Sequence, residues 1–119
     1  MFKVDDKFYT WSSTCHGRGK RAELVTSGAY IIDHISSGWV IIGHSRTVSA
    51  EVDRQIEQLR AGRHPNRRFQ SQFSSTNHES SIDIKLMEFP AKSVKDGKVI
   101  EAKIRTSYRE QNGDFCITN

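Results

Sequence analysis

Two short runs of β-branched and aromatic residues lie close together in the first half of the chain. They cover residues 29–32 and 39–42, and the Ser-Ser-Gly sequence at 36–38 between them is typical of a turn. This arrangement predicts a β-hairpin over residues 28–43, and we expect Gly43 to end its second strand. A third strand is predicted at residues 82–89, where apolar and polar residues alternate up to Pro90.

An amphipathic helix is predicted directly after the hairpin. Four apolar residues recur there at helical spacing and share one face: Val48, Val52, Ile56 and Leu59. Thr47 or Ser49 can cap the start of this helix, and Gly62 can close it. Phe69 and Phe73 are four residues apart and predict a second, shorter helix.

The pattern over residues 98–110 fits two structures. Ile100, Ile104 and Tyr108 have helical spacing. The alternation of Ile100, Ala102, Ile104 and Thr106 also fits a strand. We favour the helix. Residues 115–118 are a candidate for a final short strand.

Composition places the chain among ordinary globular domains. It has 119 residues, 35% hydrophobic and 27% charged, which suits one domain with one core. No apolar run approaches the ~20 residues that cross a bilayer, and the N-terminus lacks a signal-peptide pattern. We therefore expect a cytoplasmic protein with no membrane partner. Cys15 and Cys116 lack metal-binding spacing and are expected to be reduced thiols.

Residues 1–27 are expected to form an N-terminal extension to a main domain of residues 28–119. Phe2, Val4, Phe8 and Trp11 could supply a strand within it. The extension could complete the sheet, cover a cleft or form an interface.

A glycine-rich segment of the extension is also basic. Residues 15–21 combine two glycines with Arg18, Lys20 and Arg21, a composition that suits a phosphate-contacting loop and equally a plain solvated loop. The net charge of the whole chain is +4, a mild excess that suits a polyanionic partner.

The order of elements and several residues in register resemble the GIY-YIG nuclease domain. Gly28-Ala29-Tyr30 stands where the family has Gly-Ile-Tyr, and Ile41-Ile42-Gly43 stands where it has Tyr-Ile-Gly. No gap is needed over residues 27–73. Six residues downstream look like the Leu-x-x-Gly-x-His-x-Asn-x-x-x-Gln-x-x-Phe run of homing-type members: Leu59, Gly62, His64, Asn66, Gln70 and Phe73.

The resemblance implies a small α/β (α+β) domain with a three-stranded, mainly antiparallel sheet flanked by helices. It also implies a DNA endonuclease that uses one divalent ion, Mg²⁺ or Mn²⁺, held by a glutamate. A tyrosine helps to activate the nucleophile in such enzymes, and an arginine on the first helix stabilises the phosphate. Tyr30 matches that tyrosine, and Glu101 is the candidate metal ligand.

Two histidines are further candidates for the site. His64 matches a histidine of homing-type members, and His44 is a candidate general base because its unperturbed pKa is near neutrality. Each candidate also has a structural interpretation. Tyr30 could pack on the sheet, His64 could cap a helix, His44 could lie on the surface, and Glu101 could pair with Arg105.

Two positions depart from the family pattern. The second tyrosine is replaced by Ile41, which cannot transfer a proton, and the position of the arginine is occupied by Glu51, whose charge opposes a phosphate. Arg54 or Arg46 could replace that arginine. Glu51, however, lies on a similar helical face to Arg54 and would partly neutralise it.

Three functions remain open from the sequence. The first is a DNA-binding protein with a degenerate nuclease site whose catalysis is impaired or lost. The second is an active, metal-dependent DNA endonuclease with a rearranged site. The third is a phage or mobile-element inhibitor that binds a host protein. DNA would be contacted by the loop cations together with a further set of arginines: Arg46, Arg63, Arg67 and Arg68.

Overall fold

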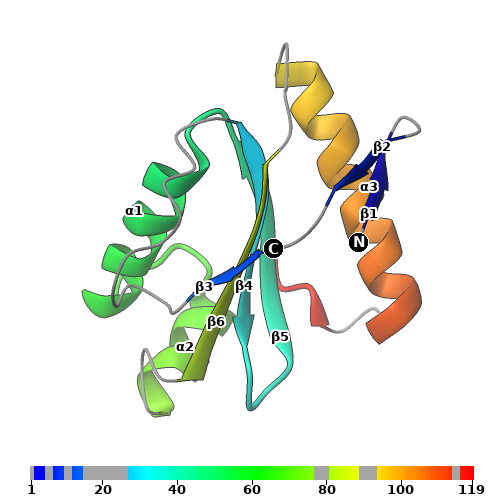
Figure 1. Ribbon diagram of the computed structural model, residues 1–119. Coiled ribbons are helices and arrows are strands. Elements are labelled where there is room, and N and C mark those ends of the chain that lie inside the picture. The colour runs from blue at the N-terminus through cyan, green and yellow to red at the C-terminus, as the bar shows by residue number, and fades with distance from the viewer. Residues whose placement is uncertain are drawn as a thin grey trace.

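The centre of the fold is a four-stranded antiparallel sheet in the order β3-β6-β4-β5 (Figure 1). The computed structural model describes residues 2–4, 7–9, 12–14, 27–76, 81–88, 94–113 and 116–119. The strands of the sheet are β3 (Ser12–Thr14), β6 (Ile82–Glu88), β4 (Gly28–His34) and β5 (Trp39–Ser45). Two further strands, β1 (Phe2–Val4) and β2 (Lys7–Tyr9), pair with each other outside that sheet.

The predicted hairpin is confirmed, with one correction at its end. Gly38 closes the turn with a φ of 74°, in the left-handed region that glycine tolerates. Gly43 does not end the second strand. It pairs with Tyr30, and the ladder continues through His44 to Ser45, because Ala29 and Gly28 supply main-chain partners for both.

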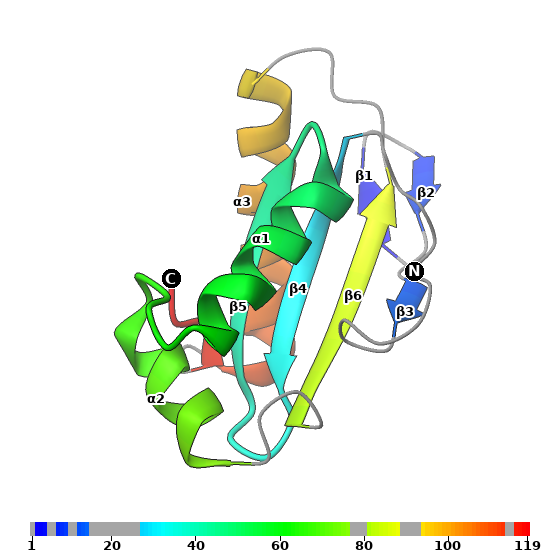
Figure 2. The same ribbon diagram turned by 90° about the vertical axis from the view of Figure 1, so that its left-hand side faces the viewer.

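The helices cover the two faces of the sheet (Figures 1 and 2). Helices α1 (Val48–Arg60) and α2 (Arg67–Ser75) lie on one face, and α3 (Val94–Asn112) lies on the other. Successive residues of a strand point to opposite faces, so each central strand contributes to two cores. Tyr30 and Ile32 pack with the α1–α2 side, whereas Ala29 and Ile31 pack with the α3 side.

The predicted amphipathic face of α1 is confirmed, since Val48, Val52, Ile56 and Leu59 are all buried. Gly62 closes the helix as expected. Its N–H donates to the Leu59 carbonyl and the Arg63 N–H to the Gln58 carbonyl, which is a Schellman motif with Gly62 at a φ of 73°. Thr47 occupies the N-cap position, although its side chain makes no capping hydrogen bond.

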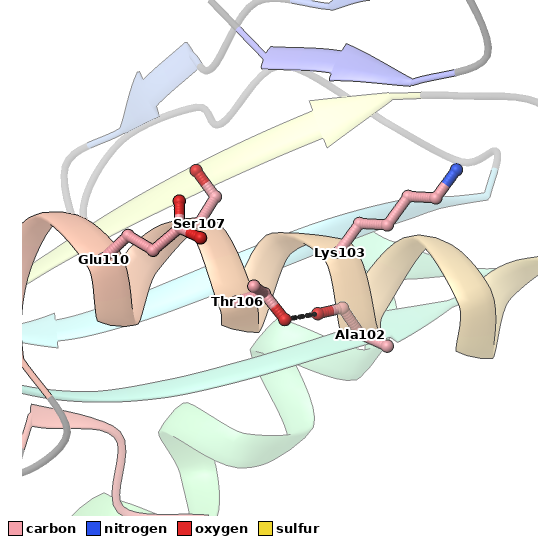
Figure 3. Close-up of a pocket in the computed structure, with 5 residues that line it drawn as sticks. All are labelled: Ala102, Lys103, Thr106, Ser107 and Glu110. Atoms are coloured by element: carbon pink, nitrogen blue, oxygen red, sulfur yellow. Dashed lines mark hydrogen bonds between the residues drawn. The ribbon is translucent and has the colours of Figure 1, made fainter.

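The region that fitted both a helix and a strand is the helix α3. Ile100 and Ile104 are buried against the sheet, while Ala102 and Thr106 are exposed. The Thr106 hydroxyl donates to the Ala102 carbonyl of the preceding turn (Figure 3). None of the helices in the described part of the chain is long and apolar enough to cross a membrane.

Both ends of the chain add to the sheet that the sequence predicted as three-stranded. Strand β3 of the N-terminal extension pairs with β6 along three residues, which makes the fourth strand. At the other end, Ile117 forms a parallel bridge with Val40 of β5. The basic loop with Arg18, Lys20 and Arg21, as well as Cys15 and Pro90, lies outside the described residues.

Candidate functional site

A buried chain of hydrogen bonds joins Tyr30 of β4 to His64 of the α1–α2 connection. The Asn66 main-chain N–H donates to His64 Nδ1 over 3.0 Å, so the imidazole proton lies on Nε2. That Nε2 lies 2.9 Å from Gln55 Oε1, and Gln55 Nε2 donates to the Tyr30 hydroxyl over 2.5 Å. Tyr30, Gln55 and His64 are 5%, 7% and 4% exposed, so the network is shielded from water.

Burial fixes the protonation state at both ends of this network. It raises the pKa of Tyr30 to about 12, with a further contribution from the negative charge of Glu51. It also lowers the pKa of His64, and the positive charge of Arg54 acts in the same direction. At neutral pH, Tyr30 therefore keeps its proton and His64 is uncharged. With its hydroxyl protonated, Tyr30 does not act as a general base in this arrangement.

The residues of the downstream run hold the loop that carries His64. Gln70 Oε1 accepts the His64 main-chain N–H, and Gln70 Nε2 donates to the Leu59 carbonyl. The Asn66 side chain accepts the Phe69 N–H and so caps α2. Leu59, His64, Asn66 and Gln70 therefore all take part in holding this loop, which gives their spacing a structural role.

Glu51 and Arg54 form a two-pronged ion pair on the exposed side of α1. Arg54 Nε donates to Glu51 Oε1 over 2.7 Å, and Arg54 Nη2 donates to Oε2 over 2.8 Å. This confirms the expectation that Glu51 neutralises Arg54. The Arg54 side chain is 58% exposed and that of Glu51 is 21% exposed, so the carboxylate lies nearer the protein than the guanidinium.

A second cluster forms on the opposite face of the sheet, between β5 and α3. His44 Nδ1 lies 2.8 Å from Glu101 Oε1, and Arg105 Nε donates to Glu101 Oε2 over 2.9 Å. The predicted pairing of Glu101 with Arg105 is thus confirmed, and His44 is a second partner. Gly97 of α3 makes room for the His44 ring, because a Cβ there would lie 2.8 Å from His44 Nε2.

These contacts bear directly on Glu101 as a metal ligand. Both carboxylate oxygens are already hydrogen-bonded, one of them to a guanidinium whose charge opposes a cation. Throughout the part of the chain that the structure describes, no three His, Cys, Asp or Glu side chains gather as a metal-binding group. As arranged, His44, Glu101 and Arg105 do not fit a divalent ion, and no chemical step is assigned to one.

The predicted site residues are therefore divided between two faces. Tyr30, Arg54 and His64 belong to the α1–α2 face, whereas His44 and Glu101 belong to the α3 face. The two groups approach each other around β5, where Tyr30 pairs with Gly43, the residue before His44. Glu101 is near enough to Tyr30 for its charge to help raise the tyrosine pKa.

The candidate DNA-binding arginines cluster around the start of α2. Arg63, Arg67 and Arg68 are all exposed. The Arg68 guanidinium lies 5.0 Å from the ring centroid of Trp39, in a cation–π contact. Arg46 is exposed at the other end of the sheet, after β5.

A shallow pocket lies on the surface of α3. It is lined by Ala102, Lys103, Thr106, Ser107 and Glu110 (Figure 3). None of the predicted site residues lines it.

Sequence reasoning missed Gln55, which connects Tyr30 to His64. A signal was available, because Gln55 is a polar residue between Val52 and Ile56 on the apolar face of α1, and a buried amide needs partners.

Comparison of the chain with protein-family models, with curated proteins and with solved structures gave no match.

Proposed function

We propose that this protein is a DNA-binding module built on a GIY-YIG-type fold, in which phosphodiester cleavage is impaired or lost. The Glu51–Arg54 ion pair is the observation that carries this proposal. The resemblance assigns an arginine to position 51, and the chain has a carboxylate there that also holds the nearest arginine of the same helix face.

The electrostatics of the α1–α2 face support this interpretation. A phosphate that undergoes cleavage needs a fixed, uncompensated positive charge at its oxygens. Glu51 instead directs negative charge toward the Tyr30 hydroxyl, whose pKa of about 12 keeps it protonated. The loss of one well-placed donor typically costs ~10²–10³ in rate, and reversal of its charge costs more.

Binding to DNA requires exposed positive charge but no catalytic geometry. The exposed arginines around α2 supply that charge. Arg63 and Arg67 flank Asn66, whose cap fixes the start of the helix, so both guanidinium groups project from an ordered segment. Contacts of this kind to phosphates give salt-dependent affinity without base specificity.

The test combines binding and cleavage with the same protein preparation. The affinity for a labelled duplex is measured by fluorescence anisotropy at several salt concentrations, and nicking of supercoiled plasmid is measured with Mg²⁺, Mn²⁺ or EDTA. We expect binding without nicking. The double variant Arg63→Ala, Arg67→Ala should lower the slope of log affinity against log salt by about two.

A charge-matched control distinguishes loss of the proposed binding surface from a general loss of positive charge. Lys98→Ala, Arg109→Ala removes two exposed cations from α3. An equal loss of affinity in both double variants would argue against a binding surface around α2. Absence of binding by the folded protein would remove DNA as the partner.

A second candidate function rests on the hydrogen bond between His44 and Glu101. A carboxylate at Nδ1 orients an imidazole so that Nε2 can take a proton from a nucleophilic water, as an active endonuclease with a rearranged site requires. Nicking that is lost in both His44→Ala and Glu101→Ala, and is retained in Tyr30→Phe, would favour this alternative.

A further inference from the structure

Arg68 and Trp39 form a cation–π pair at the end of the molecule where α2 and the β4–β5 turn lie together (Figures 1 and 2). Trp39 is the first residue of β5 and is partly buried against the apolar cluster of the α1–α2 face. Arg68 belongs to the first turn of α2 and is exposed. The indole therefore covers one side of the guanidinium, while the rest of the Arg68 side chain meets solvent.

The arginines around α2 differ from most of those on the other helices in their electrostatic surroundings. Three arginines of α1 and α3 are paired with a glutamate of their own helix: Arg54, Arg60 and Arg105. Within the described part of the chain, no carboxylate forms an ion pair with Arg63, Arg67 or Arg68. Residues 58–78 contain neither Asp nor Glu, so the surface around α2 keeps its positive charge.

The placement of this charge is unfavourable for the isolated protein. Arg67 and Arg68 lie in the first turn of α2, where positive charge opposes the helix dipole, and that turn contains no acidic residue to offset it. Arg63 adds a third exposed cation in the loop just before the helix. A bound polyanion relieves this repulsion, so the surface favours a partner that carries phosphates.

We propose that the Trp39–Arg68 pair binds an unpaired base of single-stranded DNA, while Arg63 and Arg67 contact the flanking phosphates. This inference rests on the proposed DNA binding and narrows its substrate to DNA with unpaired nucleotides. Unpaired bases stack on guanidinium groups and aromatic rings of proteins. A base inside a duplex is already stacked on its neighbours and must be extruded before a side chain can cover its face.

Trp39 prepares Arg68 for such a contact in two ways. It restricts a long, flexible side chain before the nucleic acid arrives, so less conformational entropy is lost on binding. It also keeps a planar, weakly hydrated cation against an aromatic ring, which a compact and strongly hydrated lysine ammonium does less well. The order expected in the complex is the Trp39 indole, then the Arg68 guanidinium, then the base.

The experiment must separate recognition of a base from attraction to charge, because exposed arginines alone bind any polyanion, an acidic protein segment included. Three labelled ligands of equal length are compared by fluorescence anisotropy at one salt concentration: an oligothymidylate of about eight nucleotides, the same strand made of abasic nucleotides, and a duplex. The abasic strand keeps the phosphates and lacks the bases. We expect the wild type to bind the oligothymidylate about tenfold more tightly than the abasic strand.

Two lysine variants that keep the net charge locate the preference. Arg68→Lys removes the planar guanidinium, and it should lose about tenfold in affinity for the oligothymidylate while binding the abasic strand as the wild type does. Arg67→Lys is the matched control, one residue earlier in the same exposed helical turn, and it should keep the preference for bases. Circular dichroism checks that both variants are folded.

The possible failures of the two proposals are distinguishable. Equal affinity of the wild type for the oligothymidylate and the abasic strand overturns the stacking inference and leaves the proposed DNA binding in place. An equal loss of preference in both lysine variants also overturns it, because the Trp39–Arg68 pair would then have no particular role. Absence of binding to all three ligands removes both proposals. Tighter binding of an oligouridylate of the same length would assign the pair to RNA and overturn the choice of DNA.

Discussion

The Tyr30 hydroxyl lies directly over Gly43, its cross-strand partner on β5. A Cβ built on Gly43 would lie 2.5 Å from Tyr30 Cζ, well inside van der Waals contact. The glycine of the second tripeptide and the tyrosine of the first therefore depend on each other. This contact also keeps the hydroxyl within reach of Gln55.

Gly43→Ala is expected to destabilise the protein, because the tyrosine ring must move and its hydrogen bond with Gln55 is broken. Overpacking of this kind costs about 1–3 kcal/mol in the free energy of unfolding, measurable by urea titration. In a double-mutant cycle with Tyr30→Phe, the double variant should lose less free energy of unfolding than the sum of the two single losses. Strict additivity would show that the contact carries no energy.

Gln55→Leu tests the connection between Tyr30 and His64. The leucine fills similar space but leaves the His64 Nε2–H and the tyrosine oxygen without their buried partner, so we expect a loss of about 1–3 kcal/mol. Gln58→Leu, on a less buried face of the same helix, is the control and should change stability by under ~0.5 kcal/mol. Equal effects of the two variants would contradict the network.

The stability of the fold should fall on mild acidification, and His64 should contribute to that fall. Burial lowers its folded-state pKa from 6.5, so above pH 6.5 it is neutral in both states and its contribution is complete. Below pH 6.5 the unfolded chain takes up a proton that the folded state resists. The free energy of unfolding then falls by at most ~1.4 kcal/mol per pH unit for this group.

The measurement for His64 is urea unfolding at pH 7.5, 6.5 and 5.5, compared with His64→Gln. His34 is also buried with a lowered pKa and contributes in the same direction, so the difference in slope isolates His64. If the free energy of unfolding depends on pH in the same way in both proteins, the folded-state pKa of His64 is not lowered.

Glu51→Gln releases Arg54 from its ion pair and should strengthen DNA binding. Because the pair is exposed, its loss should change stability by under ~1 kcal/mol. The freed guanidinium should steepen the salt dependence of binding by about one unit. Glu57→Gln, which breaks the Glu57–Arg60 pair of the same helix, is the charge-matched control. An equal gain in DNA affinity from Glu51→Gln and Glu57→Gln would show a general effect of net charge, with no particular role for Arg54.

Glu51→Arg addresses catalysis directly. It places at position 51 the cation that the resemblance assigns there, and it removes the carboxylate that neutralises Arg54. Because Glu101 stays bonded to His44 and Arg105, we expect plasmid nicking to remain at background in this variant, and a rise in nicking would show that the cation at position 51 was the missing group. A protein that nicks DNA before the change and loses that activity afterwards would show that Glu51 belongs to a working site.

Local patterns predicted most of the elements and the contacts within one helix. The buried face of α1 follows from its spacing, as do the Glu51–Arg54 and Glu101–Arg105 pairs, since residues three and four apart share a helix face. The Tyr30–Gly43 pair follows from the length of the turn, which sets the hairpin register.

Contacts between distant segments were not predictable in this way. His44 and Glu101 are 57 residues apart, and their contact depends on how α3 packs over the sheet. Strand β3 has only three residues, all Ser or Thr, so it lacks an apolar pattern and is recognisable only by its pairing with β6. The alternation at 100, 102, 104 and 106 was coincidental, because burial against the sheet selects the helical set.

The pairing of β5 with residues 116–119 also has a consequence for synthesis. The two partners are 77–78 positions apart, so at ~5–20 residues per second the edge of β5 emerges roughly 4–16 s before its cover. During that interval the nascent chain exposes open main-chain donors and acceptors beside an aliphatic run. Chaperone contact and co-translational aggregation are therefore expected to concentrate on residues 39–45, and to fall once residues 116–119 have left the ribosome and paired with β5.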